Sequence, residues 1–474
     1  MKVKECIQKI IGRSIFDSRG IPTVEVDLNT VIGRVRASCP SGASTGSQEA
    51  LEIRDAEKSV CMGKGVQKAL MGVEEIATSL ITKSFKITCQ EEIDKHMNEL
   101  DGTPNKSRLG ANAILPMSIC FVRLGARYLR IEDWMYIRML MNNQPSESKK
   151  EAPENEVLHL PTGGVLVNNM QADSRLGSVE SALAGPGSTE KERLRKKLKA
   201  STPQIFFNVI NGGAHSDNGL FVQEVMVSFE GSTPYTMLSS ASEFIAALKS
   251  IVKQKYKLTG VGDEGGFAPP INSLEEALDL IQSASQESGV TPQIALDVAA
   301  SEFYKNNMYN VGWKTTEKLI GADELAEYYE KIIKKYKVCM IEDPFDEKDY
   351  AGWAAFMKRA DSLGVRVVGD DLIVTNPELI RQAGEKKLCN VALIKMNQIG
   401  TITETISAVK EARQQGMKVM ASHRSGETED AFLAHLSVGI DADYLKAGSL
   451  CRSERVCKYN ELIRIFEKCK IDTI

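Results

Sequence analysis

Apolar and polar positions follow different periods in different parts of the chain. Residues 21–38 hold two strand-like runs, PTVEVDL and VIGRVRAS, whose alternating valines favour a sheet with one face in water. From about residue 47 to 140 the pattern is mainly helical, over Val66 to Leu80, Glu91 to Leu100 and Asn112 to Leu129. We therefore predict a smaller α+β domain over residues 1–140.

After residue 203 short apolar runs alternate with helix-like segments such as ADELAEYYEKIIKKY. The runs are QIALD (293–297), KVCMIED (337–343), VRVVGDD (365–371), NVALIK (390–395), MKVMASH (417–423) and ADYLKAG (442–448). Strands that alternate with helices indicate parallel βα units, and roughly 270 residues suffice for an eight-stranded barrel. The predicted fold class is α/β, with a TIM-like barrel over residues 203–474.

Residues 141–202 separate the two predicted domains. They are rich in Ser, Pro, Glu and Lys and poor in aromatic residues, which is typical of a low-complexity insertion or linker. Within them, the run KERLRKK at 191–197 is either a basic recognition patch or a solvated face. We favour the solvated face, which is the commoner role of such runs.

Composition excludes several classes of protein. The 59 Lys and Arg against 63 Asp and Glu give a net charge of −4, so no global basic field attracts nucleic acid, although a local patch stays possible. No apolar run reaches about 18 residues, so no transmembrane helix is predicted. The opening MKVKECIQKI leaves no room for a signal peptide, and the cysteines form no CxxC pair. We expect a cytoplasmic protein with free thiols.

Each apolar run of the predicted barrel ends in a polar or charged residue that could take part in catalysis or binding. The side chains at the run ends are Asp297, Glu342, Asp370, Lys395, His423 and Lys446. Strand ends face the active site in such barrels, so these side chains should share one pocket. Asp297, Glu342 and Asp370 are hard oxygen donors that suit Mg²⁺. Each acid could instead cap the helix that follows its strand, but three successive strand ends favour the metal site.

Other groups complete the predicted pocket. Lys395 follows four apolar residues, so burial lowers its pKa and makes it a candidate base, whereas nearby carboxylates raise the pKa and favour a structural salt bridge. The segment ASHRSGETED sets Ser422, His423, Arg424 and Ser425 at a strand end, where Arg and Ser suit a phosphate oxygen.

Two loops add acidic groups. VGDEGGFAPP places Glu264 between glycines, and NVINGGAHSDNGLFVQE carries His215, Gln223 and Glu224 after a glycine turn. Each loop alone could be mere turn chemistry. Together with the metal site, the lysine and the phosphate clamp, they suit proton abstraction next to a carboxylate, whose charged product a metal stabilises.

The motifs in their order resemble the enolase family over about residues 8–140 and 203–467. They are DSRGIPTVEVDL, PSGASTG, LGANAIL, NVINGGAH, VGDEGGFAPP, IEDPFDEKDY, VGDDLIVTN, KMNQIGTITE, SHRSGETEDAF and RSERVCKYNELIRI. The resemblance implies Mg²⁺-dependent dehydration of 2-phosphoglycerate to phosphoenolpyruvate. It also implies a modified eight-stranded barrel behind a small α+β cap domain.

The resemblance assigns roles to individual residues. Lys395 matches the base that removes the C2 proton, and Glu264, with Glu224 beside it, matches the acid that assists departure of the hydroxyl. Asp297, Glu342 and Asp370 match the ligands of a first Mg²⁺, and Ser44 matches the ligand of a second. The implied substrate-binding residues are His215, Glu224, Glu342, Asp370, Ser422, His423, Arg424, Ser425 and Lys446.

The resemblance further implies a homodimer, with Arg13, Glu25 and Glu454 at interface positions. The chain departs from the family pattern at the 141–202 insertion, at Ser216-Asp217, at Pro116 and at Leu450-Cys451. Asp217 could add negative charge where an anionic substrate enters. A proline inside a helix costs about 3 kcal/mol unless it lies in the first turn or at a kink.

Two other functions stay open. The first is an enolase-like protein with little or no catalysis, which acts as a binding factor for a cytoskeletal or nucleic-acid partner through its insertion. The second is another reaction of the enolase superfamily. The PSGASTG and SHRSG motifs, which suit a phosphorylated substrate, disfavour the second alternative.

Overall fold

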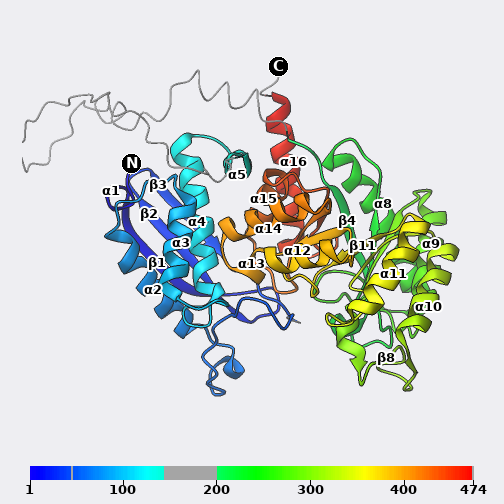
Figure 1. Cartoon of the computed structure of the whole chain (residues 1–474). Helices are drawn as coiled ribbons and strands as arrows, with labels where there is room; N and C mark the ends of the chain where they lie inside the picture. The colour runs from blue at the N-terminus through cyan, green and yellow to red at the C-terminus, as the bar shows by residue number, and fades with distance from the viewer. Residues whose placement is uncertain (44–45, 143–199, 472–474) are drawn as a thin grey trace, which may run out of the picture.

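The computed structural model describes residues 1–43, 46–142 and 200–471, and it contains the two expected kinds of architecture. An antiparallel sheet with helices packed on it precedes a closed barrel of strands (Figure 1). The α+β cap and the α/β barrel predicted from the sequence are both confirmed. In the described ranges no helix is long and apolar enough to cross a membrane.

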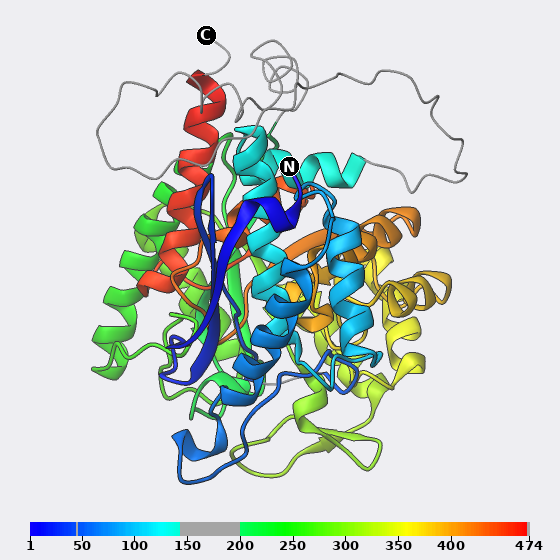
Figure 2. The same ribbon diagram turned by 90° about the vertical axis from the view of Figure 1, so that its left-hand side faces the viewer.

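The cap domain is built on a three-stranded sheet in the order β1-β2-β3. Its strands are β1 (Ile7–Phe16), β2 (Pro22–Thr30) and β3 (Gly33–Ser38). Its helices are α1 (Val3–Cys6), α2 (Gln67–Ile81), α3 (Gln90–Asp101), α4 (Ala111–Leu129) and α5 (Asp133–Asn142), with a 3-10 turn η1 (Cys61–Gly63). Figure 2 shows the sheet and these helices side by side in front of the barrel.

The expected wet face of this sheet is wrong for β2, which is buried on both sides. Its two carboxylates, Glu25 and Asp27, pair with arginines of the neighbouring strands. Asp27 Oδ2 lies 2.6 Å from Nη2 of Arg13, and its Oδ1 lies 2.7 Å from Nε of Arg36. Although burial alone raises it, the hydrogen bonds from Arg36 and Arg13 bring the pKa of Asp27 down to about 2.

Eight strands close the barrel in the order β10-β11-β12-β13-β14-β4-β5-β6. They are β4 (Gln204–Asn211), β5 (Glu224–Ser228), β6 (Gln293–Asp297), β10 (Val338–Glu342), β11 (Arg366–Gly369), β12 (Val391–Ile394), β13 (Lys418–Ser422) and β14 (Tyr444–Lys446). β5 pairs antiparallel with both of its neighbours, whereas the other pairs are parallel. One reversed strand thus modifies the barrel.

Helices cover the outside of the barrel. They are α8 (Pro234–Tyr256), α9 (Leu274–Ser288), α10 (Ala322–Tyr336), α11 (Tyr350–Leu363), α12 (Pro377–Glu385), α13 (Met396–Ile399), α14 (Ile402–Gln414), α15 (Phe432–Gly439) and α16 (Ser453–Ile471). A small sheet of β7 (Tyr304–Lys305), β8 (Met308–Asn310) and β9 (Leu319–Ile320) and the 3-10 turns η2 (Gly213–His215) and η3 (Ala300–Phe303) lie in the loops. The element α10 has the bounds of the predicted ADELAEYYEKIIKKY segment.

The barrel interior is packed and gives the strand ends a rigid base. It is filled by Phe206, Met226, Ala295, Met340, Val368, Val391, Leu393, Met420 and Tyr444. Pro116 lies inside α4, beyond its first turn, and the helix continues through it. The hydrogen bond that residue 116 would donate is lost, so the cost expected from the sequence applies.

Asp94 joins the cap domain to the barrel. This buried side chain of α3 accepts hydrogen bonds from N and Oγ1 of Thr403, at 3.0 and 2.6 Å, and from Nε2 of Gln90 at 3.0 Å. Thr403 lies in the first turn of α14. Burial outweighs these hydrogen bonds and raises the pKa of Asp94 to about 6.

We predict that Asp94→Asn removes a pH dependence of stability. Because the folded pKa is about 6 and the unfolded pKa about 4, the folded state binds more protons in between, and stability falls as the pH rises through this window. The whole effect is roughly 3 kcal/mol. Urea unfolding at about pH 4.5 and about pH 7 should show the variant gaining about 2–3 kcal/mol relative to the wild type at the higher pH. An unchanged difference would contradict the burial argument.

Candidate active site

The ends of the barrel strands gather around one cavity. Five of the six predicted strand-end residues line it, namely Asp297, Asp370, Lys395, His423 and Lys446. His215, Glu224, Glu264, Arg424 and Ser425 line it as well. Glu342 is buried against the same group, where both of its carboxylate oxygens accept hydrogen bonds from Lys446.

Among the described residues, the predicted Ser422 stands apart from this cavity. The hydroxyl of Ser422 donates to the carbonyl of His423 at 3.0 Å, and Ser422 lines a separate cavity. Ser44 lies outside the described residues. Asp217 is exposed and does not line the cavity, so the structure gives no support to the expected charge at the substrate entrance.

Strand register places three carboxylates in one row. Glu342 and Glu224 are both Cα partners of Asp297, from the two sides of β6. The reversed direction of β5 brings its first residue, Glu224, to the barrel end where the parallel strands finish. None of the three predicted acidic ligands caps a helix: the N-cap residues of η3, α11 and α12 are Ala299, Asp349 and Asn376. The capping alternative is therefore set aside.

Lys446 sits among these acids. Its Nζ lies 2.8 Å from each Glu342 oxygen, 2.9 Å from Oδ2 of Asp297 and 3.6 Å from Oε2 of Glu224. Although burial lowers it, these carboxylates raise the pKa of Lys446 well above its ordinary value. The ammonium group therefore stays charged and acts as a cation between the acids.

Lys395 follows β12 and forms a close hydrogen bond with Oδ2 of Asp370. Its side chain is 13% exposed. Burial is the largest influence and lowers the pKa of Lys395, but the nearby carboxylates, Asp370 foremost, together outweigh it and the pKa is raised. The sequence left open whether burial or nearby carboxylates control the pKa of Lys395. With Lys395 hydrogen-bonded to Asp370, the carboxylates do. Asp370 also accepts a hydrogen bond from Nε2 of Gln398 at 2.9 Å.

Glu224 and Glu264 form a coupled acid pair. Nδ1 of His215 lies 3.7 Å from an oxygen of each, and Nδ2 of Asn208 donates to Glu264 at 3.1 Å. Burial and the charge of Glu264 raise the pKa of Glu224, whereas His423 and His215 overcome burial and lower the pKa of Glu264. The two carboxyls therefore titrate as a pair, with opposite shifts of their pKa values.

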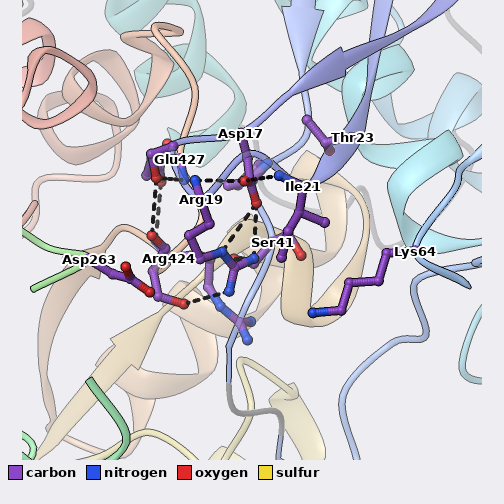
Figure 3. Close-up of polar contacts among 12 residues, drawn as sticks. Asp17, Arg19, Ile21, Thr23, Ser41, Lys64, Asp263, Arg424 and Glu427 are labelled. Atoms are coloured by element: carbon purple, nitrogen blue, oxygen red, sulfur yellow. Dashed lines mark hydrogen bonds and ion pairs between the residues drawn. The ribbon is translucent and has the colours of Figure 1, made fainter. Parts of the chain in front are cut away.

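The SHRSG segment meets the cap domain at this cavity. Arg424 donates to Oε2 of Glu49 at 2.8 Å and to Asn397 at 3.0 Å. Figure 3 shows Arg19 joined to Asp17 and to Ser41 in the same junction, where Nη2 of Arg19 donates to the Ser41 carbonyl at 3.2 Å. Sequence reasoning missed Arg19 and Glu49. The DSRG motif was the only signal for Arg19.

The donor set fits a divalent cation. Donor atoms of two groups of three lie within 4.8 Å of one another in the described residues: His215, Glu224 and Glu264, and Asp343, Asp370 and Asp371. The trio predicted from the sequence is not such a group, because Lys446 bridges Asp297 and Glu342 while Lys395 holds Asp370. Hydrogen bonds from the N–H groups of Asp370 and Asp371 to Asp343, at 2.8 and 2.9 Å, hold the second group.

The charges of the buried groups also favour a bound divalent cation. Burial and neighbouring carboxylates raise the pKa of Glu342 and Asp343, and they raise that of Asp371 to about 8. Carboxylates therefore outnumber the nearby cations. Oε2 of Glu224 and Nδ1 of His215 are buried without a hydrogen-bond partner. A divalent cation with its waters would satisfy both the charge and the unpaired atoms.

Family models match both parts of the chain. The model described as the N-terminal domain of enolase matches residues 7–137, and the model described as the C-terminal TIM barrel domain of enolase matches residues 199–473. The chain belongs to the enolase family. Enolase domains point to a lyase and imply divalent metal binding, in agreement with the acidic site.

One departure from the family pattern lies beside the Glu264 loop. The pair Leu450-Cys451 packs behind the Glu264 loop: a Cβ at Gly265, whose φ is +85°, would lie 2.9 Å from the Cys451 carbonyl. Only a residue without a side chain fits there comfortably. The altered pair therefore supports the loop without entering the cavity.

Proposed function

We propose that this enolase-family chain catalyses the Mg²⁺-dependent, reversible dehydration of 2-phosphoglycerate to phosphoenolpyruvate. One observation carries the proposal: a lysine and a coupled pair of glutamates stand at opposite sides of one acidic cavity. Lys395 follows β12 and Glu224 begins β5, and these strands are four places apart in a ring of eight. A substrate held between them can lose a proton from one carbon on one side and a hydroxyl from the next carbon on the other.

The intervening arc supplies the metal donors. Going round the barrel from β5 to β12, the strands β6, β10 and β11 carry Asp297, Glu342 and Asp370. Mg²⁺ held by these three side chains would stabilise the negative charge that develops on the substrate carboxylate. The number of ions and the role of Ser44 as a further ligand are part of the proposal.

Lys395 is the proposed base. In the contact with Asp370 it carries its proton and cannot accept another. When Asp370 turns to another cation, burial and the neighbouring charges of Arg424 and Lys446 act to lower the pKa of Lys395. Lys395 then becomes able to take the C2 proton of the substrate.

The acid pair acts on the leaving group. Glu224 carries the proton that the pair shares, and Glu264 is held as the anion by His423 and His215. Protonation of the C3 hydroxyl lets it depart as water. Because the two carboxyls are coupled, the proton can pass between them during the reaction.

On the other side of the barrel, between β12 and β5, the side chains suit a phosphate. Arg424 and Ser425 follow β13 and line the cavity. A guanidinium and a hydroxyl favour phosphate oxygens, which supports a phosphorylated substrate over a simple 2-hydroxy acid. His215, His423 and Lys446 are proposed to contact the substrate in the same cavity.

The test is an assay of the purified full chain with 2-phosphoglycerate and Mg²⁺, coupled to consumption of phosphoenolpyruvate. We expect turnover that a chelator abolishes and added Mg²⁺ restores, and no turnover of glycerate, which lacks the phosphate. Folded protein that turns over no 2-phosphoglycerate at saturating Mg²⁺ would contradict the proposal. Light scattering during gel filtration would test the proposed homodimer, for which Arg13, Glu25 and Glu454 are the expected interface residues.

A further inference from the structure

Arg455 connects helix α16 to the acid pair through His423. It lies in the first turn of α16, and its side chain is completely buried. Its Nη1 lies 2.5 Å from Nδ1 of His423 and donates to the Arg424 carbonyl at 2.6 Å. Its Nη2 donates to the carbonyls of Ser425 and Asp263, at 2.5 and 3.1 Å. Neither sequence motifs nor the proposed mechanism gave Arg455 a role.

These contacts fix which nitrogen of His423 carries hydrogen. A guanidinium group has only donors, and it keeps its charge at any pH the protein tolerates. The atom that faces Nη1 must therefore be an acceptor, so Nδ1 of His423 has a lone pair and Nε2 has the hydrogen. The doubly protonated ring is disfavoured as well, because it would turn an N–H toward the arginine.

The other ring nitrogen faces the acid pair. Nε2 of His423 lies 3.4 Å from Oε2 of Glu264, close enough for a hydrogen bond from its N–H. The charged groups around the ring are Glu264, Arg455 and Glu427. Burial first, and Arg455 in addition, lower the pKa of His423 to about 4 despite the two glutamates. His423 is therefore a neutral donor near pH 7.

We infer that Arg455 is a positioning residue that holds His423 with its lone pair on Nδ1 and its hydrogen on Nε2, so that the ring presents an N–H to Glu264. Three backbone carbonyls hold the orientation of Arg455, whereas its Nε has no hydrogen-bond partner. Oε1 of Glu454 lies 3.4 Å from its Nε and accepts a hydrogen bond from Arg452 at 2.8 Å. The consequence for turnover rests on the proposed function, whereas the form of the His423 ring does not.

NMR of the histidine ring nitrogens tests the inference directly. The chain has five histidines, so the full-length protein labelled with ¹⁵N in its histidine rings gives a simple spectrum, in which His423→Gln assigns the His423 signals. At about pH 7 we expect an unprotonated Nδ1 and a protonated Nε2 in the wild type. In Arg455→Met we expect a mixture of forms or a protonated Nδ1, and in Arg455→Lys, which keeps a donor and a charge, a return toward the wild-type spectrum.

Lys458 offers a matched control. It is a buried cation on the same helix, and its Nζ donates to the Thr428 carbonyl at 2.7 Å and lies 2.9 Å from Glu427. Lys458→Met removes a buried charge from α16 without touching His423, and the ring signals should stay those of the wild type. The inference is overturned if folded Arg455→Met leaves the ring signals unchanged, or if Lys458→Met changes them equally. It is also overturned if the wild type itself carries the hydrogen on Nδ1 of His423, a result that does not depend on any variant folding.

Activity separates this inference from the proposed function. If 2-phosphoglycerate is turned over, Arg455→Met should lower kcat about 10²-fold with little change in KM, and the double variant with His423→Gln should be no slower than His423→Gln alone. An additive loss in the double variant would contradict action through His423. If the wild type is inactive but the ring responds as expected, the proposed function fails and the positioning role stands.

Discussion

Lys395→Met is expected to abolish dehydration of 2-phosphoglycerate, lowering kcat about 10⁴-fold or more. The residue is the one side chain at the end of β12 that can accept a proton inside the cavity, and methionine keeps its length without a basic atom. Because Lys395 also pairs with Asp370, its loss leaves a buried carboxylate with fewer partners. The measurement is initial rate at saturating substrate and Mg²⁺, with circular dichroism to verify the fold.

Two control variants test whether the loss of activity is due to the missing base at position 395. Lys395→Arg keeps the charge beside Asp370 but cannot act as a base near neutral pH, so it should fold like the wild type and still be inactive. Lys334→Met, which removes an exposed lysine that pairs with Glu330 on α10, should retain full activity. Appreciable turnover by a folded Lys395 variant would show that another group removes the proton.

Lys446→Met is expected to destabilise the metal-free protein by about 3–5 kcal/mol and to make its stability depend strongly on Mg²⁺. The ammonium of Lys446 is hydrogen-bonded to Asp297 and Glu342, and its removal leaves these buried carboxylates facing each other without a cation. A divalent ion at the same carboxylates would restore the balance. Binding to the folded state then adds stability by mass action.

Thermal unfolding in chelator and in excess Mg²⁺ measures this effect. The wild type should gain stability from bound Mg²⁺ by mass action, and Lys446→Met should gain more, recovering most of its loss. Lys106→Met provides a comparison, since Lys106 is a nearly buried lysine paired with Glu404 far from the acid row. It should lose stability equally in both conditions. A Lys446→Met loss that Mg²⁺ does not reduce would mean that the acids are not the metal site.

Strand ends could be predicted from the sequence because the signal is local. An apolar run that stops at a charged residue marks both the strand and the end that faces the cavity, and five of the six residues found in this way line it. The helix Ala322–Tyr336 was equally readable, since its apolar positions repeat with the helical period.

The direction of β5 could not be predicted. Its sequence EVMVS reads as a strand in either direction, and only the pairing with β4 and β6 makes it antiparallel. The reversal matters, because it brings Glu224 to the site end of the barrel. The partly buried arginines that cover Asp27 were also unpredictable, since alternation reveals which side chains share a face but not what covers it.

The pairing partners of the buried charged groups could not be predicted from the sequence either. Sequence reasoning assigned Lys446 to the substrate, whereas in the structure its ammonium pairs with the predicted metal ligands. Arg455 meets His423 from a helix 32 positions later in the chain, and no local pattern announces that contact. Long-range pairing of buried charges depends on the folded geometry and leaves no periodic signal.

Exchange of the C2 hydrogen of 2-phosphoglycerate with deuterated water is the most direct test of the central claim, that Lys395 and the acid pair act separately on two sides of one cavity. Followed by proton NMR with Mg²⁺, the wild type should exchange this hydrogen, Lys395→Met should not, and Glu224→Gln should still exchange it while forming no phosphoenolpyruvate. The account would be contradicted if Lys395→Met exchanged the hydrogen as fast as the wild type. It would also be contradicted if Glu224→Gln lost the exchange while Lys395→Met kept it.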